Sequence, residues 1–362
     1  MGILGAEESV RMELEELRRM LVACAGLQRR KDDEEFKGVR ISAKGIDTDD
    51  AERLVCVTSG VSYLGLAIVN KLLLRGYSVR IIVESEEDIN KLREMESSGE
   101  MRTSNNNVSV VMAKLTDIES LQEAFQGCRG VFHTSAFIDP AGLSGYTKSM
   151  AEIEVKASEA VMRACARTPS VRKCVLTSSL LACIWRDSSQ YDISSSVINH
   201  GCWSDESLCI DKKLWYALGK LRAERVAWRI AKETRLKLAT ICPGLITGPE
   251  FCDRNTMATI AYLKGAQEMY ANGLLATVDV NKLAGAEVCV FEAMDRNAAG
   301  RYVCFDEVIE RDEAETLARE LGMPTNKICG NESEGVQARF RLSNEKLSSL
   351  MTRTLRYCYG EC

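Results

Sequence analysis

The sequence has no run of about 18 apolar residues, the minimum for a helix that crosses a bilayer, so a membrane-spanning protein is not expected. It also lacks an apolar stretch behind a basic start, which argues against a secretory signal. The 47 basic and 52 acidic side chains leave a formal charge of −5. This mild acidity argues against a nucleic-acid partner, which would need a basic surface.

Histidine is scarce: only His133 and His200 occur in 362 residues, too few for a histidine-rich metal site. His133 lies in a strand-like apolar segment and is interpreted as structural. The fifteen cysteines contain no CxxC pair and their number is odd, so we interpret them as free thiols in a reducing cytoplasm. No GxSxG motif or P-loop is present. We therefore expect a cytoplasmic globular protein without a metal site.

Residues 1–50 differ from the rest, with twelve acids and nine bases and no strand signal. Apolar residues recur at helical spacing from Val10 to Leu21, which predicts a short amphipathic helix over about residues 7–25. Two interpretations stay open: the helix contacts a protein partner or a second copy, or it is a frayed surface helix before a charged linker.

From residue 53, short apolar segments alternate with segments of helical periodicity, a pattern typical of βαβ units. The pattern predicts an α/β fold, a Rossmann-type doubly wound parallel sheet over residues 51–243. Residues 244–362 are expected to form a smaller, mostly helical substrate lobe, with contributions from the loop 186–210 and one strand at Arg301–Phe305. The expected strands are Leu54–Thr58, Ser78–Val83, Val108–Ala113, Val131–Thr134, Lys173–Thr177 and Leu238–Cys242, and the expected helices are Leu66–Arg75, 87–97, Asp117–Phe125, 148–167 and about 211–233.

The first strand leads into a turn, Thr58–Gly65, at the place where a dinucleotide site binds pyrophosphate on a helix N-terminus. Serines stand at two positions where glycines are usual. A serine forced to positive φ would cost on the order of 1 kcal/mol, so weakened cofactor binding is expected. A turn that merely packs is the alternative. The cofactor-binding residues predicted here are Ser59, Gly60, Val61, Ser62, Tyr63 and Leu64.

Glu84 ends the second predicted strand, where a Rossmann fold places a carboxylate on the adenosine ribose. A carboxylate there accepts from the 2′-hydroxyl of NAD and repels the 2′-phosphate of NADP. A solvated surface acid explains the residue equally well.

Tyr216 and Lys220 lie four residues apart in a predicted helix, so both project from one face. Hydride transfer to a carbonyl leaves an alkoxide that needs a proton, and a lysine ammonium beside a tyrosine favours the phenolate and lowers the pKa of the phenol. Ser179, at the end of an earlier strand, can polarise the carbonyl oxygen. An exposed tyrosine–lysine pair on a helix surface is the alternative.

Several further blocks make the chain, from about residue 53 to about 322, similar to the plant cinnamoyl-CoA reductase-like proteins. That family belongs to the extended short-chain dehydrogenase/reductases, which also include dihydroflavonol reductases. The blocks are Glu123–Cys128 leading into Val131–Thr134, Lys173–Ser179, Cys202–Asp205, Trp215–Lys220, Pro243–Pro249 and Gly300–Tyr302.

The resemblance implies a catalytic set of Ser179, Tyr216 and Lys220. It also implies that Thr134 and the backbone after Pro243 lie along the nicotinamide, and Leu115 is expected to contact the cofactor as well. The family typically uses NADPH to reduce hydroxycinnamoyl-CoA thioesters, which implies a small-molecule substrate such as a CoA ester.

Some positions depart from the family pattern. Ser59 and Ser62 replace glycines, Glu84 replaces an arginine, Lys114 replaces an acid, and Leu214 replaces an asparagine. The leading interpretation is an NAD(P)-dependent reductase of a carbonyl or thioester. The alternative is a catalytically degraded nucleotide-binding or interaction protein of the same fold.

Overall fold

The computed structural model describes residues 53–102, 107–134, 146–186, 197–330 and 339–358, all of which belong to the unit Asp47–Cys362. The helix expected over about residues 7–25, with its possible partner, lies outside the described residues. So does the part of the 186–210 loop that runs from 187 to 196. None of the described helices is long and apolar enough to cross a bilayer.

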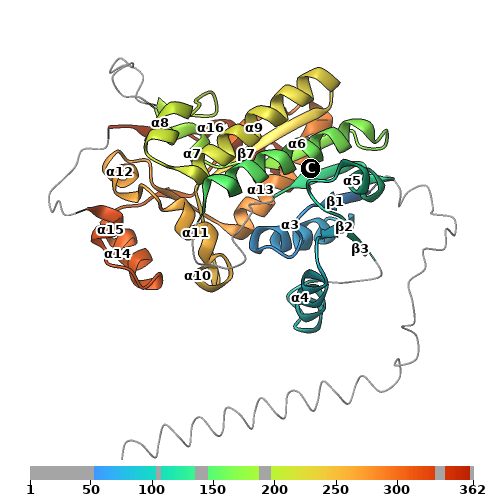
Figure 1. Ribbon diagram of the computed structural model, residues 1–362, viewed down its shortest axis with the longest axis horizontal. Helices are drawn as coiled ribbons and strands as arrows, with labels where there is room; N and C mark the ends of the chain where they lie inside the picture. The colour runs from blue at the N-terminus through green and yellow to red at the C-terminus, as the bar shows by residue number, and fades with distance from the viewer. Residues whose placement is uncertain (1–52, 103–106, 135–145, 187–196, 331–338, 359–362) are drawn as a thin grey trace, which may run out of the picture. The chain divides into compact units, whose positions relative to one another are not determined.

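A seven-stranded, all-parallel sheet forms the centre of the unit, in the order β10-β7-β5-β4-β1-β2-β3 (Figure 1). The strand order reverses beside β1, and doubly wound folds bind their ligands outside the carboxyl ends of the strands at such a reversal. The strands are β1 (Leu54–Val57), β2 (Ser78–Val83), β3 (Val108–Met112), β4 (Gly130–His133), β5 (Lys173–Thr177), β7 (Lys237–Pro243) and β10 (Gly300–Cys304). The predicted Rossmann-type sheet is thus confirmed.

Helices cover both faces of the sheet, because successive side chains of its strands point to opposite faces and are apolar on both. In β1, Val55 and Val57 join one core cluster and Cys56 joins another. The first cluster is covered by α3 (Tyr63–Leu74), α13 (Val280–Ala293) and α16 (Glu345–Cys358), and the second by α5 (Ile118–Phe125), α6 (Lys148–Arg167) and α9 (Trp215–Thr234). Helices α6 and α9 run side by side (Figure 1).

Side-chain caps fix where two of these helices begin. Asp117 accepts a hydrogen bond from the Glu119 amide at 3.3 Å and caps the start of α5. Ser85 caps α4 (Glu86–Ser97) through the Asp88 amide. The predicted bounds of β2, β5 and α6 match the structure.

The sequence after Pro243 does more than form a helical lobe, since β10 and α13 return to the main sheet. Three short strands were missed, β8 (Leu245–Thr247), β9 (Ala276–Asp279) and β11 (Glu307–Val308), which form a second sheet. A third sheet pairs β6 (Val197–Ile198) with β12 (Arg341–Leu342). The remaining helices are α7 (Leu181–Ile184), α8 (Glu206–Asp211), α10 (Phe251–Arg254), α11 (Thr256–Tyr262), α12 (Ala266–Ala271), α14 (Arg311–Glu320), α15 (Asn326–Cys329) and the 3₁₀ turn Met294–Arg296.

Candidate active site

The turn between β1 and α3 is built around the hydroxyl of Ser62, the N-cap residue of α3. Its Oγ accepts from the Gly65 amide at 3.0 Å and donates to the Ser59 carbonyl at 2.7 Å. Ser62 has φ −77° and ψ 161°, and Ser59 is not among the described residues with positive φ. The expectation of strained serines was therefore wrong. Extended backbone suits serine, and the Ser62 hydroxyl provides the hydrogen bond that the Gly65 amide needs at the helix N-terminus.

Gly60 and Gly65 are the two glycines of the turn that are sterically necessary. Neither occupies a position where this chain has serine in place of a family glycine. A Cβ on Gly65 would lie 1.8 Å from the Ser59 carbonyl oxygen, and a Cβ on Gly60 would lie 2.6 Å from Ile81 Cγ2. The turn thus keeps the close backbone approach of a dinucleotide site.

Glu84 lies where β2 and β3 end. Its Oε2 accepts from the Leu115 amide at 3.4 Å, and its own amide donates to Asp88 at 3.1 Å. Loss of water around the carboxyl raises the pKa of Glu84. Arg80 donates to the Ala124 and Gln126 carbonyls at 2.7 Å, so this guanidinium is committed to the end of α5.

Ser179, Tyr216 and Lys220 meet at a cavity of about 80 Å³ beside the β1–α3 turn. Ser179 Oγ accepts from the Leu181 amide at 3.2 Å, and Tyr216 is the second residue of α9. Of the residues predicted to bind cofactor, Ser62, Tyr63, Leu64, Thr134, Lys220 and Pro243 line this cavity, whereas Ser59, Gly60, Val61, Glu84 and Leu115 are not among its described lining residues.

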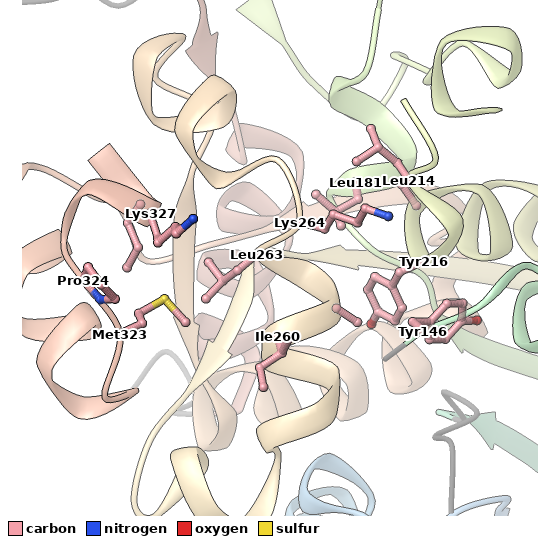
Figure 2. Close-up of a pocket in the computed structure, with 13 residues that line it drawn as sticks. Tyr146, Leu181, Leu214, Tyr216, Ile260, Leu263, Lys264, Met323, Pro324 and Lys327 are labelled. Atoms are coloured by element: carbon pink, nitrogen blue, oxygen red, sulfur yellow. The ribbon is translucent and has the colours of Figure 1, made fainter. Parts of the chain in front are cut away.

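A larger cavity of about 520 Å³ adjoins Tyr216, which lines both. Figure 2 shows Tyr146 and Tyr216 together on one side, with Met323, Pro324 and Lys327 on the other. The lining is mostly apolar, from Leu181, Leu214, Ala217, Ile260, Ala261, Leu263, Met323, Pro324 and Ile328, with two cations, Lys264 and Lys327. Tyr216 therefore stands between the small cavity that Ser179 and Lys220 line and a space of the size that small molecules occupy.

Lys220 forms a buried ion pair that the sequence had not suggested. Its Nζ lies 2.7 Å from Glu154 Oε1 on α6, and both side chains are at most 5% exposed. Tyr146 donates a hydrogen bond to the other oxygen of Glu154. The Tyr146 and Tyr216 rings meet edge to face with centroids 5.0 Å apart, and Lys220 Nζ lies 5.7 Å from the Tyr216 ring centroid.

This environment changes the expected acidity of Tyr216. Burial raises the pKa of Tyr216, the Lys220 charge lowers it, and the Glu154 charge raises it again, with a net upward shift. The predicted effect of Lys220 has the expected direction, since its charge lowers the pKa of Tyr216, but desolvation outweighs the ammonium and the net shift is upward. Burial lowers the pKa of Lys220, but Glu154 and Tyr216 more than offset this, so the net shift is upward.

His133 and Thr134 lie beside the cavity at the end of β4. His133 Nδ1 lies 3.0 Å from Thr58 Oγ1, and burial followed by the Lys220 charge lowers the pKa of His133 to about 3. The imidazole is therefore neutral near pH 7, which fits a structural role. Thr134 Oγ1 is buried and has no hydrogen-bond partner among the described residues.

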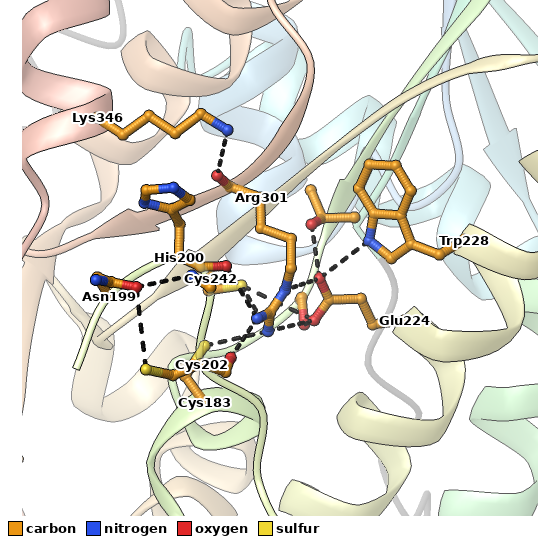
Figure 3. A network of polar contacts seen from close by, with 12 residues as sticks. Cys183, Asn199, His200, Cys202, Glu224, Trp228, Cys242, Arg301 and Lys346 are labelled. Carbon is orange, nitrogen blue, oxygen red and sulfur yellow. Dashed lines mark hydrogen bonds and ion pairs between the residues drawn. The ribbon is translucent and has the colours of Figure 1, made fainter. Parts of the chain in front are cut away.

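Glu224, one turn beyond Lys220, fixes the helix that carries the site (Figure 3). Its carboxylate lies 2.7 Å from Arg301 Nε on β10 and accepts from Ser178 and Thr240 at 2.6 Å each. Arg301 also donates to the backbone carbonyls of His200 and Cys202. Glu224 thus joins α9 to β7, to β10 and to the residue after β5, and Arg301 extends the network to the loop before α8.

Glu287 on α13 is another buried acid beside the site. Its Oε1 accepts from Thr177 Oγ1 at 2.6 Å, and its Oε2 has no hydrogen-bond partner in the described part of the chain. Burial raises the pKa of Glu287 to about 7, although Thr177 and Lys220 act in the opposite direction. No cluster of three metal-ligating side chains occurs among the described residues.

Four residues of this environment were not predicted from the sequence: Glu154, Glu224, Glu287 and Tyr146. A signal existed for the three acids, because each occupies the buried stripe of its helix. Glu154 follows Ala151 and precedes Ala157 on that stripe of α6. A carboxylate at such a position requires a buried partner.

Comparison with known proteins supports the architecture. The model of the 3-beta hydroxysteroid dehydrogenase/isomerase family matches residues 56–301. Cinnamoyl-CoA reductase 1 of Petunia hybrida is 34% identical over 309 residues, which cover 82% of this chain and 86% of that protein. The resemblance to cinnamoyl-CoA reductases predicted from sequence is thereby confirmed.

Two solved structures share the fold. Vestitone reductase from alfalfa (Medicago sativa) superposes with a TM-score of 0.58 at 21% identity, over 82% of this chain and 91% of that one. Yeast methylglyoxal/isovaleraldehyde reductase, solved with NADPH, gives a TM-score of 0.60 at 18% identity, over 83% and 93%.

Proposed function

The chain belongs to the 3-beta hydroxysteroid dehydrogenase/isomerase family, and on that premise we propose that it is an NAD(P)-dependent reductase of a carbonyl compound or CoA thioester. One observation carries the proposal: Ser179, Tyr216 and Lys220 line one cavity together with the Ser62–Leu64 turn. The relatives' names favour a phenylpropanoid-like substrate.

The residues present fit a nicotinamide dinucleotide. Gly60 and Gly65 allow the β1–α3 turn to close, since a Cβ on either would collide with the protein's own atoms, and the first amides of α3 other than that of Gly65 remain for the pyrophosphate. The unpartnered Thr134 hydroxyl, Lys220 and Pro243 line the cavity beyond it. Glu84 would accept from the adenosine ribose and disfavour a 2′-phosphate, so NADH is the expected cofactor. When bound, the reduced cofactor supplies a hydride to the carbonyl carbon.

The chain's own groups would handle the oxygen and the proton. Because Ser179 Oγ accepts from the Leu181 amide, its proton is free to be donated to the carbonyl oxygen. Tyr216 gives its proton to the same oxygen as negative charge develops there. Lys220 holds positive charge beside the phenol and limits the energy of the phenolate left behind.

The 520 Å³ cavity would take the body of the substrate, with the carbonyl directed at Tyr216. Its apolar walls suit an aromatic or aliphatic group. Lys264 and Lys327 are the cations that the phosphates of a CoA ester would meet. The twelve cysteines described are free thiols, which fits the cytoplasm as the site of action.

The test has two steps on the purified protein. NADH and NADPH are titrated by nicotinamide fluorescence, and cofactor oxidation is then followed with a hydroxycinnamoyl-CoA thioester and the corresponding aldehyde. Tyr216→Phe should lose at least ~100-fold in kcat/KM, the scale of general acid catalysis. Tyr270→Phe, the same change on α12, serves as the matched control.

An unchanged rate in Tyr216→Phe would contradict the assignment of the proton donor. The second candidate is a protein of this fold without turnover, favoured by the Ser62 hydroxyl, which already occupies the Gly65 amide. Failure of both cofactors to bind at millimolar concentration would support that candidate.

A further inference from the structure

Glu154 is a charged residue in the middle of a buried helix surface. It is 3% exposed, and its neighbours on the same stripe of α6 are small or apolar, among them Ala151, Ala157 and Val161. Packing alone does not require a carboxylate there, since burying one is unfavourable unless it is paired. Its two oxygens contact Lys220 and Tyr146, both of which lie at the proposed site.

We propose that Glu154 is a positioning residue of the reductase, which holds the Lys220 ammonium in place and charged beside Tyr216. The inference rests on the proposed function, because it assigns Glu154 a role through two members of the catalytic set. Glu154 itself lies behind Lys220 and is not among the described residues that line either cavity.

The contacts form a closed ring of four side chains. Tyr146 donates to Glu154, Glu154 pairs with Lys220 at 2.7 Å, Lys220 lies over the Tyr216 ring, and the Tyr216 ring meets the Tyr146 ring at 5.0 Å. Both carboxylate oxygens are therefore engaged. The ammonium is fixed on the side of Tyr216 that faces α6.

The other titratable groups around Lys220 are poorer counter-charges near pH 7. Glu287, from α13, has a pKa of about 7 and is therefore partly protonated. His133, from β4, is neutral because its pKa is about 3. Tyr146 and Tyr262 stay neutral because burial raises the pKa of each phenol. A buried lysine without a full counter-charge tends to lose its proton, so Glu154 is the group that prevents this.

Loss of the Glu154 charge should shift the pH dependence of activity in one direction only. Reduction needs both Tyr216 protonated and Lys220 charged, so the active form is lost as soon as the Tyr216–Lys220 pair releases its first proton from either group. Removing the negative charge of Glu154 favours that loss, whichever of the two groups releases the proton. An opposite charge within ~4–6 Å shifts a pKa by roughly 1–3 units, so the alkaline limb of activity should move down by about that amount.

Three variants separate charge from packing. Glu154→Gln keeps the shape and removes the charge, and Glu154→Asp keeps the charge in a shorter side chain. Glu152→Gln makes the same chemical change at an exposed position of the same helix. The first measurement is the pH profile of kcat/KM with the reduced cofactor. The expected result is a lowered alkaline limb in Glu154→Gln only, with Glu154→Asp closer to the wild type.

The second measurement needs neither cofactor nor substrate. The protein is labelled with ¹³C-lysine, and the signal that is absent in Lys220→Met is assigned to Lys220. The phenolate absorbance that is absent in Tyr216→Phe is assigned to Tyr216. Both signals are then followed in one pH titration. The first deprotonation of the pair should fall by at least one pH unit in Glu154→Gln. If the wild type has no turnover, the proposed function fails, yet this titration still decides the role of Glu154.

The proposal would be overturned if the pair lost its first proton at the same pH in the wild type and in Glu154→Gln. It would also be overturned if Glu154→Asp and Glu154→Gln shifted that pH by the same amount. If Glu154→Gln does not fold, Tyr146→Phe takes its place. That change removes a donor from Glu154 and leaves its charge, so the first deprotonation should stay or rise. A fall of one unit or more would contradict the proposal.

Discussion

Arg301 Nε lies 2.7 Å from Glu224 Oε1, with Glu224 fully buried and Arg301 6% exposed. The pair joins β10 to α9 directly behind the proposed active site. Glu224→Gln leaves the guanidinium buried without its counter-charge, so the free energy of unfolding should fall by roughly 3–5 kcal/mol. Urea or guanidinium unfolding followed by circular dichroism measures the change.

The control for this prediction is Glu159→Gln, which breaks the partly exposed pair with Arg163 at 2.8 Å. Exposed pairs of this kind contribute about 0–1 kcal/mol. Similar losses in the two variants would mean that the buried pair has no special role in holding α9.

The role of the Ser62 hydroxyl leads to a prediction about cofactor affinity, and its effect on affinity can be measured separately from its effect on stability. Ser62→Gly removes the hydroxyl that occupies the Gly65 amide, and glycine at an N-cap costs only a few tenths of a kcal/mol. NADH should therefore bind more tightly, with little change in unfolding. Ser62→Ala should lose about 1 kcal/mol of stability because the cap is lost and nothing replaces it.

Fluorescence titration with NADH and chemical unfolding test the two serine variants side by side. Weaker NADH binding in Ser62→Gly would show that the hydroxyl contributes a bond to the cofactor rather than competing with it.

Much of this fold could be predicted from the sequence because most strands of the sheet, though not the edge strand β3, are buried on both faces. Each strand from β1 to β7 in the main sheet is a short apolar run, and the helices between them are longer and periodic. Strands β8 and β11 have three and two residues, too few to show a period, and β9 has no continuous apolar run because Thr277 and Asp279 interrupt it, so these strands were missed.

The site was predicted only in part, and the reason is physical. Ser179, Tyr216 and Lys220 could be found from spacing and strand ends, since one helix turn and one strand fix their positions. The partner of Lys220 comes from another helix, and no local pattern links Glu154 to it. The effect of Lys220 on the pKa of Tyr216 could be predicted from their spacing, but the net shift could not, because it also depends on burial and on Glu154.

Glu84 determines the expected choice between the two nicotinamide cofactors. Glu84→Gln removes the negative charge that disfavours a 2′-phosphate but keeps an acceptor for the Leu115 amide. The ratio of kcat/KM for NADPH to that for NADH should rise at least tenfold. Wild-type protein that already prefers NADPH would contradict the role given to Glu84, whatever the variant does.

Glu287 couples stability to pH. Burial raises the pKa of Glu287 from its usual 4.5 to about 7, so between these values the folded chain keeps a proton that the unfolded chain has lost. The stabilisation that this proton confers is complete below pH 4.5 and is lost as the pH rises to about 7. The free energy of unfolding should therefore fall between pH 5 and 7 through this group alone, by at most about 1.4 kcal/mol per pH unit.

Glu287→Gln isolates this contribution, because glutamine keeps an acceptor for Thr177 Oγ1 and does not titrate. Urea unfolding of both proteins at pH 5, 6, 7 and 8 gives the difference in stability at each pH. Relative to the variant, the wild type should lose about 2 kcal/mol from pH 5 to 7 and little more by pH 8. Parallel curves would mean that Glu287 ionises near its ordinary pKa, with the Lys220 charge nearby compensating for its burial.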